Sequence, residues 1–326
     1  MRRPSALAVA LLLVAALGGC GSSSSDTTSS KSSAPSSTTA KPEQFPSPKG
    51  LSLNDLHQRY PAVAQLAPGA GVLTKGPTRM PFLVLDKNGK PVLGAAVALY
   101  TLRPDGSGLR GPFPATSRTF GLSPAFVSQT AQADLEATKG FYTADPVLRS
   151  TRPANMVALL RLDGRLVSTG PAPLGGKFGK TPVQVGQQAP RVHTQTLTDV
   201  GGNAKAIDTR VPPATDMLKD DLYDVLGKKP VVLIFATPQL CQSRVCGPVV
   251  DVAEQVKSET KADVSFIHNE VYVDNNPSKG LRPQLPAYGL ETEPWIFIID
   301  RSGKVVQRFE GAVGVDELKA AVAKIS

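Results

Sequence analysis

The chain has few aromatic residues and no block of basic ones. Phe, Trp and Tyr make up 6% of its 326 residues, and its 36 Lys and Arg residues are scattered among 27 acidic ones, for a net charge of +9. Nucleic-acid binding normally combines clustered cationic side chains with aromatic platforms. The composition therefore gives no support to a nucleic-acid partner. It favours only a weak, screened attraction to anionic surfaces.

The sequence also lacks an apolar run long enough to cross a membrane. The best candidate, residues 6–17, follows Arg2 and Arg3 and ends in LGGC, with Cys20 last. A spanning helix needs about 20 apolar residues, whereas a basic start and a short apolar middle are typical of a secretory signal. We expect residues 1–19 to be a lipoprotein signal peptide. Lipid on Cys20 would then anchor the protein to the cell membrane on its extracytoplasmic face.

Residues 20–50 resemble a tether. Residues 22–39 contain fourteen Ser or Thr among eighteen positions, and a Pro-rich stretch follows. Such a segment buries too little apolar surface to offset the entropy of ordering, so we expect it to be flexible. Residues 51–76 form a short lead segment, in which the apolar positions between Leu51 and Leu66 predict one helix or turn.

Residues 77–175 have the pattern of an all-β module. Asn88-Gly89 predicts a hairpin turn between apolar runs at 80–86 and 91–102, and Asp163-Gly164 predicts a second. Two further short runs, 126–132 and 140–145, also alternate as strands do. This pattern favours a sandwich of immunoglobulin-like type. Because the module has neither cysteine nor histidine, we interpret it as a spacer or binding module, followed by a linker at 176–184.

Residues 185–326 change character to α/β. The apolar run 231–236 predicts a buried strand, and Val245, Val249, Ala253 and Val256 recur at helical spacing. A second strand is expected within 263–274, then a hairpin over 295–309 and a helix over 315–325. This order implies a mixed sheet covered by helices on both faces.

A cysteine pair, Cys241 and Cys246, directly follows the first of these strands in the sequence ATPQLCQSRVCGP. Together with the element order and the lead-in VGQQAPRVHTQTL, it resembles the thioredoxin superfamily over residues 185–326. The sequence Thr-Glu-Pro-Trp at 292–295 is similar to the cis-proline turn of that family, and the resemblance implies a substrate groove at Glu293, Pro294 and Trp295. The whole arrangement also resembles a group of actinobacterial lipoproteins.

The resemblance implies thiol–disulfide exchange, in which Cys241 attacks and Cys246 resolves the mixed disulfide. The Cys-x4-Cys spacing restricts this chemistry. Residues five apart in one helix have Cα atoms about 8.6 Å apart, and a disulfide needs about 6.8 Å or less. Either the helix starts late, with Pro248 at its first position, or it includes both cysteines and unwinds on oxidation.

Three alternatives remain open. Q-type (bacterioferritin-comigratory) peroxiredoxins use cysteines at this spacing, but their motif requires Pro and Thr or Ser where this chain has Ile234 and Pro238. A related thioredoxin-fold branch delivers copper with two cysteines and a histidine, for which His268 is the candidate ligand. The third alternative is a structural disulfide in a redox-inactive adaptor. The prediction is therefore disulfide exchange with envelope proteins, without a cofactor.

Overall fold

The computed structural model describes residues 38–152, 154–175, 180–241 and 244–326, which belong to one compact unit. The signal peptide, Cys20 and most of the expected tether lie outside these ranges. Within them, none of the helices has the length and hydropathy that crossing a membrane demands.

The N-terminal half is built from strands, as the sequence predicts. The strands are β1 (Thr38–Thr39), β2 (Ala62–Pro68), β3 (Gly76–Pro77), β4 (Met80–Leu85), β5 (Val97–Leu102), β6 (Arg110–Pro114), β7 (Thr116–Arg118), β8 (Phe141–Ala144), β9 (Val147–Leu148), β10 (Ala154–Leu162), β11 (Arg165–Thr169) and β12 (Ala172–Leu174). All but β3 and β9 form one sheet in the order β1-β7-β8-β4-β2-β11-β10-β5-β6, with β12 on β10. Strand β2 lies between the β1-β7-β8-β4 half of this sheet and the β11-β10-β5-β6 half, since it pairs antiparallel with β4 and parallel with β11.

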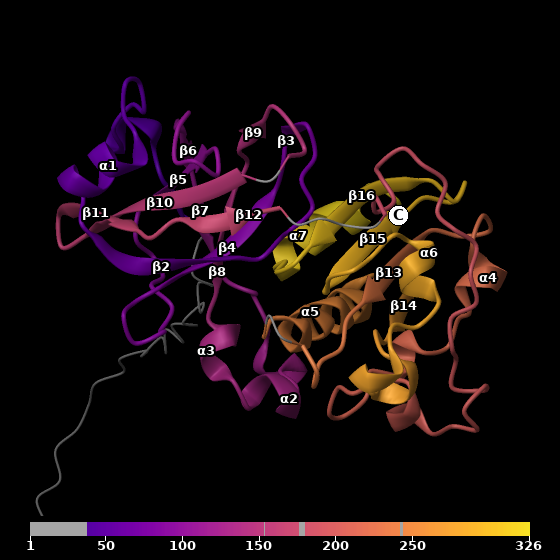
Figure 1. The fold of residues 1–326 in the computed structure, drawn as a ribbon. Helices are drawn as coiled ribbons and strands as arrows, with labels where there is room; N and C mark the ends of the chain where they lie inside the picture. The colour runs from indigo at the N-terminus through magenta and orange to yellow at the C-terminus, as the bar shows by residue number, and fades with distance from the viewer. Residues whose placement is uncertain (1–37, 153, 176–179, 242–243) are drawn as a thin grey trace, which may run out of the picture. The chain divides into compact units, whose positions relative to one another are not determined.

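The two halves of this sheet share one apolar core. Phe82 of β4 and Tyr142 of β8 come from one half, and Leu99 of β5 and Met156 of β10 from the other. The opposite faces of β5 and β10 are apolar too, and they pack on helix α1 (Leu53–Arg59), whose Leu56 is fully buried (Figure 1). Strand β10 is therefore buried on both faces.

One of the two expected hairpins is confirmed. Strands β10 and β11 pair across Asp163-Gly164, where both residues have positive φ, as a tight two-residue turn requires. The Asn88-Gly89 turn also forms, and Leu85 pairs with Pro91 across it. However, the prediction that the flanking runs form a hairpin is wrong, because β5 goes on to pair with β10 and β6 instead of β4.

Residues 126–132 do not form the expected strand. They lie in a segment with the 3-10 helix η2 (Pro124–Phe126) and the helices α2 (Gln129–Gln132) and α3 (Leu135–Thr138). The Ser128 side chain caps α2 by accepting the Ala131 N–H, which favours helix over strand. We call residues 119–140 the α2–α3 segment. The expected strand at 140–145 is confirmed as β8, and the lead segment contains both α1 and β2.

The C-terminal half has the element order that the sequence predicts. Its strands are β13 (Val231–Phe235), β14 (Ser265–Asn269), β15 (Trp295–Ile299) and β16 (Val305–Glu310), and its helices are α4 (Leu222–Val225), α5 (Cys246–Glu259), α6 (Gln284–Ala287) and α7 (Val315–Val322). This half also contains the short 3-10 turns η3 (Ala204–Ala206), η4 (Thr215–Met217), η5 (Val273–Asn275) and η6 (Pro277–Lys279), and one further 3-10 turn, η1 (Pro42–Gln44), precedes α1 in the N-terminal half. The sheet order is β14-β13-β15-β16, with β13 parallel to β14 and antiparallel to β15.

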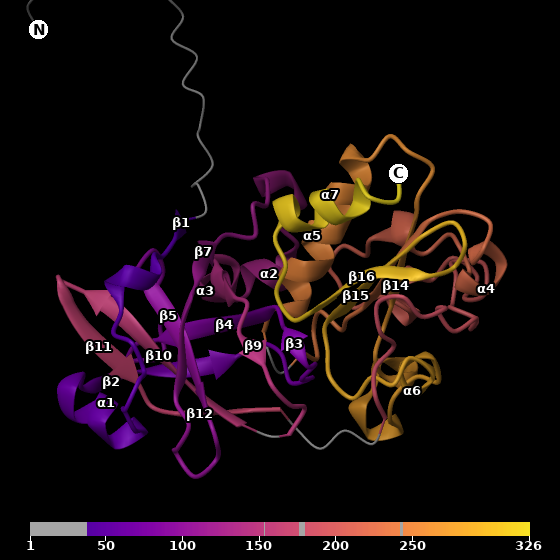
Figure 2. The same ribbon diagram turned by 90° about the horizontal axis from the view of Figure 1, so that it is seen from above.

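Helices cover both faces of this mixed sheet, as expected. The face that carries α5 and α7 is lined by Val232, Ile234, Ile296 and Ile298. The alternate residues of β13 and β15 point to the other face and pack against α4 and α6 (Figure 2). Because both faces are apolar, the strands appear in the sequence as continuous hydrophobic runs.

The N-terminal and C-terminal halves of the chain contact each other through partly buried polar groups. Arg79 forms a two-pronged ion pair with Glu317 of α7, with both N–O distances 3.0 Å. Glu310, at the end of β16, accepts the backbone N–H groups of Gly71 and Val72 at 2.8 and 3.1 Å. Phe120 of the α2–α3 segment packs in the same core as α5 and α7.

Candidate functional site

The cysteine pair lies where β13 leads into α5. Cys241 precedes the helix and Cys246 is its first residue, and a disulfide joins them with Cα atoms 5.9 Å apart. The structure thus has the late helix start, the first of the two arrangements that permit the bond. The helix begins two residues before Pro248 and not at it. In this disulfide-bonded state, α5 does not include Cys241.

The two sulfur atoms differ in environment. Cys241 is partly exposed, whereas Cys246 is fully buried. The Cys246 residue also lies at the N-terminus of a 14-residue helix, where unpaired backbone N–H groups and the helix dipole favour negative charge. The sulfur that an incoming thiolate can reach is therefore Cys241, and the sulfur best placed to leave is Cys246.

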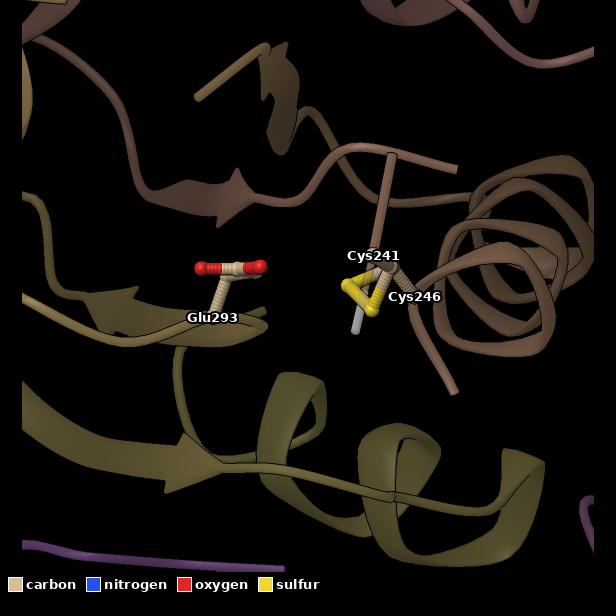
Figure 3. Close-up of side chains that lie close together, drawn as sticks. All are labelled: Cys241, Cys246 and Glu293. Carbon is tan, nitrogen blue, oxygen red and sulfur yellow. A yellow bond between two sulfur atoms is a disulfide. The ribbon is translucent and has the colours of Figure 1, made fainter. Parts of the chain in front are cut away.

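A carboxyl group faces this disulfide. Glu293 lies on the loop that leads into β15, and its carboxylate oxygen and both sulfur atoms lie within 4.8 Å of one another (Figure 3). Burial raises the pKa of Glu293 above its ordinary value. In the reduced state, two thiolates and this carboxylate could also hold a metal ion.

The residues next to Glu293 are more deeply placed than a substrate groove requires. The Glu293–Pro294 bond is cis, as the resemblance implies, and Pro294 is buried, with its carbonyl accepting the Gly311 N–H at 2.9 Å. Trp295 is 1% exposed, stacks on Phe297 and donates its indole N–H to a threonine hydroxyl. Of the three residues expected to form the groove, only Glu293 is partly exposed beside the cysteines.

The α2–α3 segment lies against the cysteine site, which the sequence did not reveal. A cavity of about 140 Å³ is lined on one side by Thr130, Ala131 and Asp134, and on the other by Cys241 and Arg244, with Pro238, Gly247 and Pro248. Arg244 and Asp134 form an ion pair across it. The segment therefore borders one side of Cys241.

A buried charge network holds the same segment on α5. The Arg210 side chain is 4% exposed and donates to Asp251 at 2.7 Å. It also forms an ion pair with Glu254, with an N–O distance of 2.5 Å, and both acids lie on α5. Asp251 also accepts the backbone N–H and the hydroxyl of Ser128. Burial raises the pKa of both carboxyl groups, although the arginine opposes it. The sequence contains no spacing that links these four residues.

His268 does not join the cysteines. Its ring is buried in β14, with Nε2 3.0 Å from the Ala236 carbonyl and Nδ1 3.5 Å from an Asp208 oxygen. Among the residues described, the metal-ligating atoms that cluster with it belong to Asp208 and Glu270. The copper site of two cysteines and His268 is therefore not assembled in this structure.

A second, larger cavity lies in the N-terminal half. It measures about 1060 Å³, and its lining combines apolar side chains such as Leu73 with four arginines, Arg103, Arg110, Arg149 and Arg152. Guanidinium groups suit carboxylate and phosphate groups. This cavity has the charge to bind an acidic ligand.

Comparison with known proteins finds matches among solved structures. No family model and no curated protein matches the chain. A crystal structure described as a thioredoxin-like superfamily protein matches 42% of this chain and 95% of its own, at 18% identity and a TM-score of 0.29. The strand order of the C-terminal sheet and the cysteine pair at the start of α5 agree with the resemblance seen in the sequence.

Proposed function

We propose that this protein is a membrane-anchored, extracytoplasmic thioredoxin-like protein that exchanges disulfides with envelope proteins through Cys241 and Cys246. The observation that carries the proposal is the disulfide between a partly exposed Cys241 and a buried Cys246 at the start of α5. The anchor would be lipid on Cys20, for which the N-terminal sequence is the support.

The chemistry follows from this asymmetry. A substrate thiolate attacks the Cys241 sulfur, a mixed disulfide forms, and the Cys241–Cys246 bond breaks with Cys246 leaving as a thiolate. A protonated Glu293 is near enough to transfer its proton to that thiolate. A second substrate thiolate then displaces Cys241, so the substrate gains a disulfide and the protein gains two thiols. The reverse sequence reduces a substrate disulfide.

The N-terminal module is proposed to be an immunoglobulin-like sandwich. The orders β7-β8-β4-β2 and β11-β10-β5-β6 support this, because they correspond to strands D-E-B-A and G-F-C-C′ of such a sandwich. In this proposal the module supplies the α2–α3 segment that lies over the cysteines.

The first test is the redox chemistry of the purified full-length protein. We expect dithiothreitol to reduce the Cys241–Cys246 disulfide readily. When a peptide disulfide is added, the variant Cys246→Ser should form a mixed disulfide with it, and the variant Cys241→Ser should not. A reduction potential below about −300 mV, which is typical of structural disulfides, would contradict the proposal.

The role of Glu293 has a separate test. Glu293→Gln keeps the side-chain shape but cannot supply the proton. We expect slower reduction of the disulfide and a pH profile that loses its acidic limb. Glu291→Gln, two residues earlier and exposed, is the matched control and should match the unmodified protein. Equal profiles for all three proteins would remove Glu293 from the mechanism.

A second candidate function is a redox-inactive adaptor. One observation favours it: the arginine-lined cavity offers a binding site away from the cysteines. If the adaptor is correct, Cys241→Ser/Cys246→Ser should retain the protein's binding partners in the envelope. Hydrogen peroxide consumption that depends on Cys241 would instead support a peroxidase.

The membrane anchor is tested independently. Cells that express the protein should incorporate a fatty-acid label into it, and Cys20→Ser should abolish the label and release the protein from the membrane fraction. Membrane association that survives Cys20→Ser would exclude a lipid on this cysteine as the anchor.

A further inference from the structure

Three buried side chains meet at the carboxyl end of β14, apart from the cysteine pair. Asp208, His268 and Glu270 are each about 1% exposed, and one ligating atom from each lies within 4.8 Å of the others. Among the described residues, neither carboxylate has a lysine or arginine side chain within 4.0 Å. Their electrostatic partners are the His268 ring, when protonated, beside Asp208, and Arg282, whose charge interacts with Glu270.

The histidine ring shows which atom faces these carboxylates. A carbonyl oxygen only accepts hydrogen bonds, so Nε2 must carry the hydrogen that it donates to Ala236. In the neutral ring, Nδ1 presents a lone pair to the Asp208 oxygen 3.5 Å away, and in the protonated ring it presents an N–H to the same oxygen. Despite its burial, the pKa of His268 is raised to about 8 by the Asp208 carboxylate. Nδ1 has no hydrogen-bond partner within normal distance among the described residues, so either a proton or a metal ion could lie between the two atoms.

Glu270 has the same deficiency. Its Oε1 accepts the backbone N–H and the hydroxyl of Thr209, both at 2.7 Å, while its buried Oε2 has no hydrogen-bond partner among the described residues. One extra proton on His268 would satisfy Nδ1 and leave Oε2 unpaired. A metal ion would satisfy both atoms at once.

We propose that Asp208, His268 and Glu270 bind a divalent transition-metal ion, and that zinc is the ion this ligand set suits best. One imidazole nitrogen and two carboxylate oxygens are three of the ligands that zinc accepts. Ligating histidines commonly donate their other ring N–H to a backbone carbonyl, as His268 does to Ala236. The 3.5 Å separation of Nδ1 and Oδ1 is close to that of two ligands on one tetrahedral zinc ion, about 3.3 Å.

The fourth position would be open to water. A cavity of about 350 Å³ reaches Asp208 and is lined also by Thr209, Gln239 and Asn275. Asp208 is the ligand that borders this cavity, whose lining also includes Lys205 and Arg210. The site also adjoins the segment that leads to Cys241, since Ala236 follows β13 and the Gln239 N–H donates to the Thr209 hydroxyl.

The test uses zinc alone and the full-length protein in which all three cysteines are serine, so that no thiolate can bind the ion. After chelator treatment and dialysis, isothermal titration with zinc chloride should show one bound ion per chain, and thermal unfolding should shift upward with zinc. Cobalt(II), as a spectroscopic substitute, should give the visible absorption of a tetrahedral nitrogen–oxygen site.

The variants identify the ligands. Glu270→Gln keeps an oxygen for the Thr209 hydrogen bonds and should weaken zinc binding at least tenfold. His268→Gln should abolish binding. Glu254→Gln, another partly buried carboxyl outside the cluster, should leave the affinity unchanged. Absence of zinc binding, or binding that Glu270→Gln leaves intact, would overturn the proposal, and Glu270→Gln decides the matter even if His268→Gln does not fold.

Discussion

The buried ion pair between Arg210 and Asp251 offers the sharpest test of how the α2–α3 segment is held on α5. The Arg210 side chain also donates to the carbonyl groups of Pro212 and Phe126, at 2.6 and 3.0 Å. Arg210→Met removes all of these donors and keeps most of the side-chain volume. The buried Asp251 carboxylate then retains only the two hydrogen bonds from Ser128.

Breaking a buried pair by removing one partner costs about 3–5 kcal/mol. Because Ser128 still donates two hydrogen bonds, we expect the lower end, about 3 kcal/mol. The loss should depend on pH. Burial raises the pKa of Asp251 even in the intact protein, and loss of Arg210 raises it further. An acid whose folded pKa lies above its unfolded value loses stability as pH rises through the folded pKa, so the deficit should be largest near pH 8 and smaller near pH 5.

Urea unfolding measures this directly, because the single tryptophan, Trp295, is buried in the C-terminal sheet. Its fluorescence and far-UV circular dichroism should give coincident transitions. Arg301→Met, at an exposed arginine, is the control and should change stability by less than about 0.5 kcal/mol. A loss below about 1 kcal/mol for Arg210→Met, or one that is independent of pH, would refute the reasoning.

Three further predictions concern other parts of the chain. Glu293→Gln should make the free energy of unfolding depend less on pH. Because the pKa of Glu293 is raised in the folded protein, its contribution to stability is present below the unfolded pKa and lost as pH rises toward 7. The loss should be less than about 1 kcal/mol because the group is partly exposed, and unfolding at pH 4 and 7 measures it. Gly164→Val should cost about 1–2 kcal/mol, since Gly164 has φ +77° and side chains disfavour this region; an unchanged melting temperature would contradict it. Leu56→Ala should cost about 3 kcal/mol, because Leu56 is fully buried under β5 and β10, and urea unfolding checks this value.

Much of the C-terminal fold could be predicted, because its strands are buried on both faces. The runs of β13 and β15 are continuous and apolar, and the four-residue spacing of α5 is regular. The N-terminal half was harder. The Asn88-Gly89 turn was correctly located, but a turn does not determine which strand comes next to which, and β5 pairs with strands far along the chain. Pairing of this kind depends on the whole core and not on local sequence.

The cysteine site could be predicted only in part. Cys241, Cys246 and Glu293 come together because the end of β13 and the start of β15 lie side by side in the centre of the sheet. The family resemblance pointed to both segments. Trp295 was expected in the groove, but it is buried. The alternation of side chains along β15 places it on the face of the sheet that α6 covers. Ser128 and Asp134, which contact Asp251 and Arg244, lie in the α2–α3 segment, more than 100 residues earlier in the chain, so no local pattern could reveal them.

These long-range contacts mean that the cysteine site cannot be assigned to the C-terminal half alone. Helix α5 carries Cys246 at its first residue and Asp251 one and a half turns later, and Asp251 is satisfied jointly by Arg210 and by Ser128. A shift of the α2–α3 segment would therefore break hydrogen bonds to the helix that carries the disulfide, as well as changing access to Cys241. Exposure of the cysteines and the stability of α5 are linked through the same few polar groups. For this reason, the segment that borders Cys241 is also part of the support that positions the helix carrying Cys246.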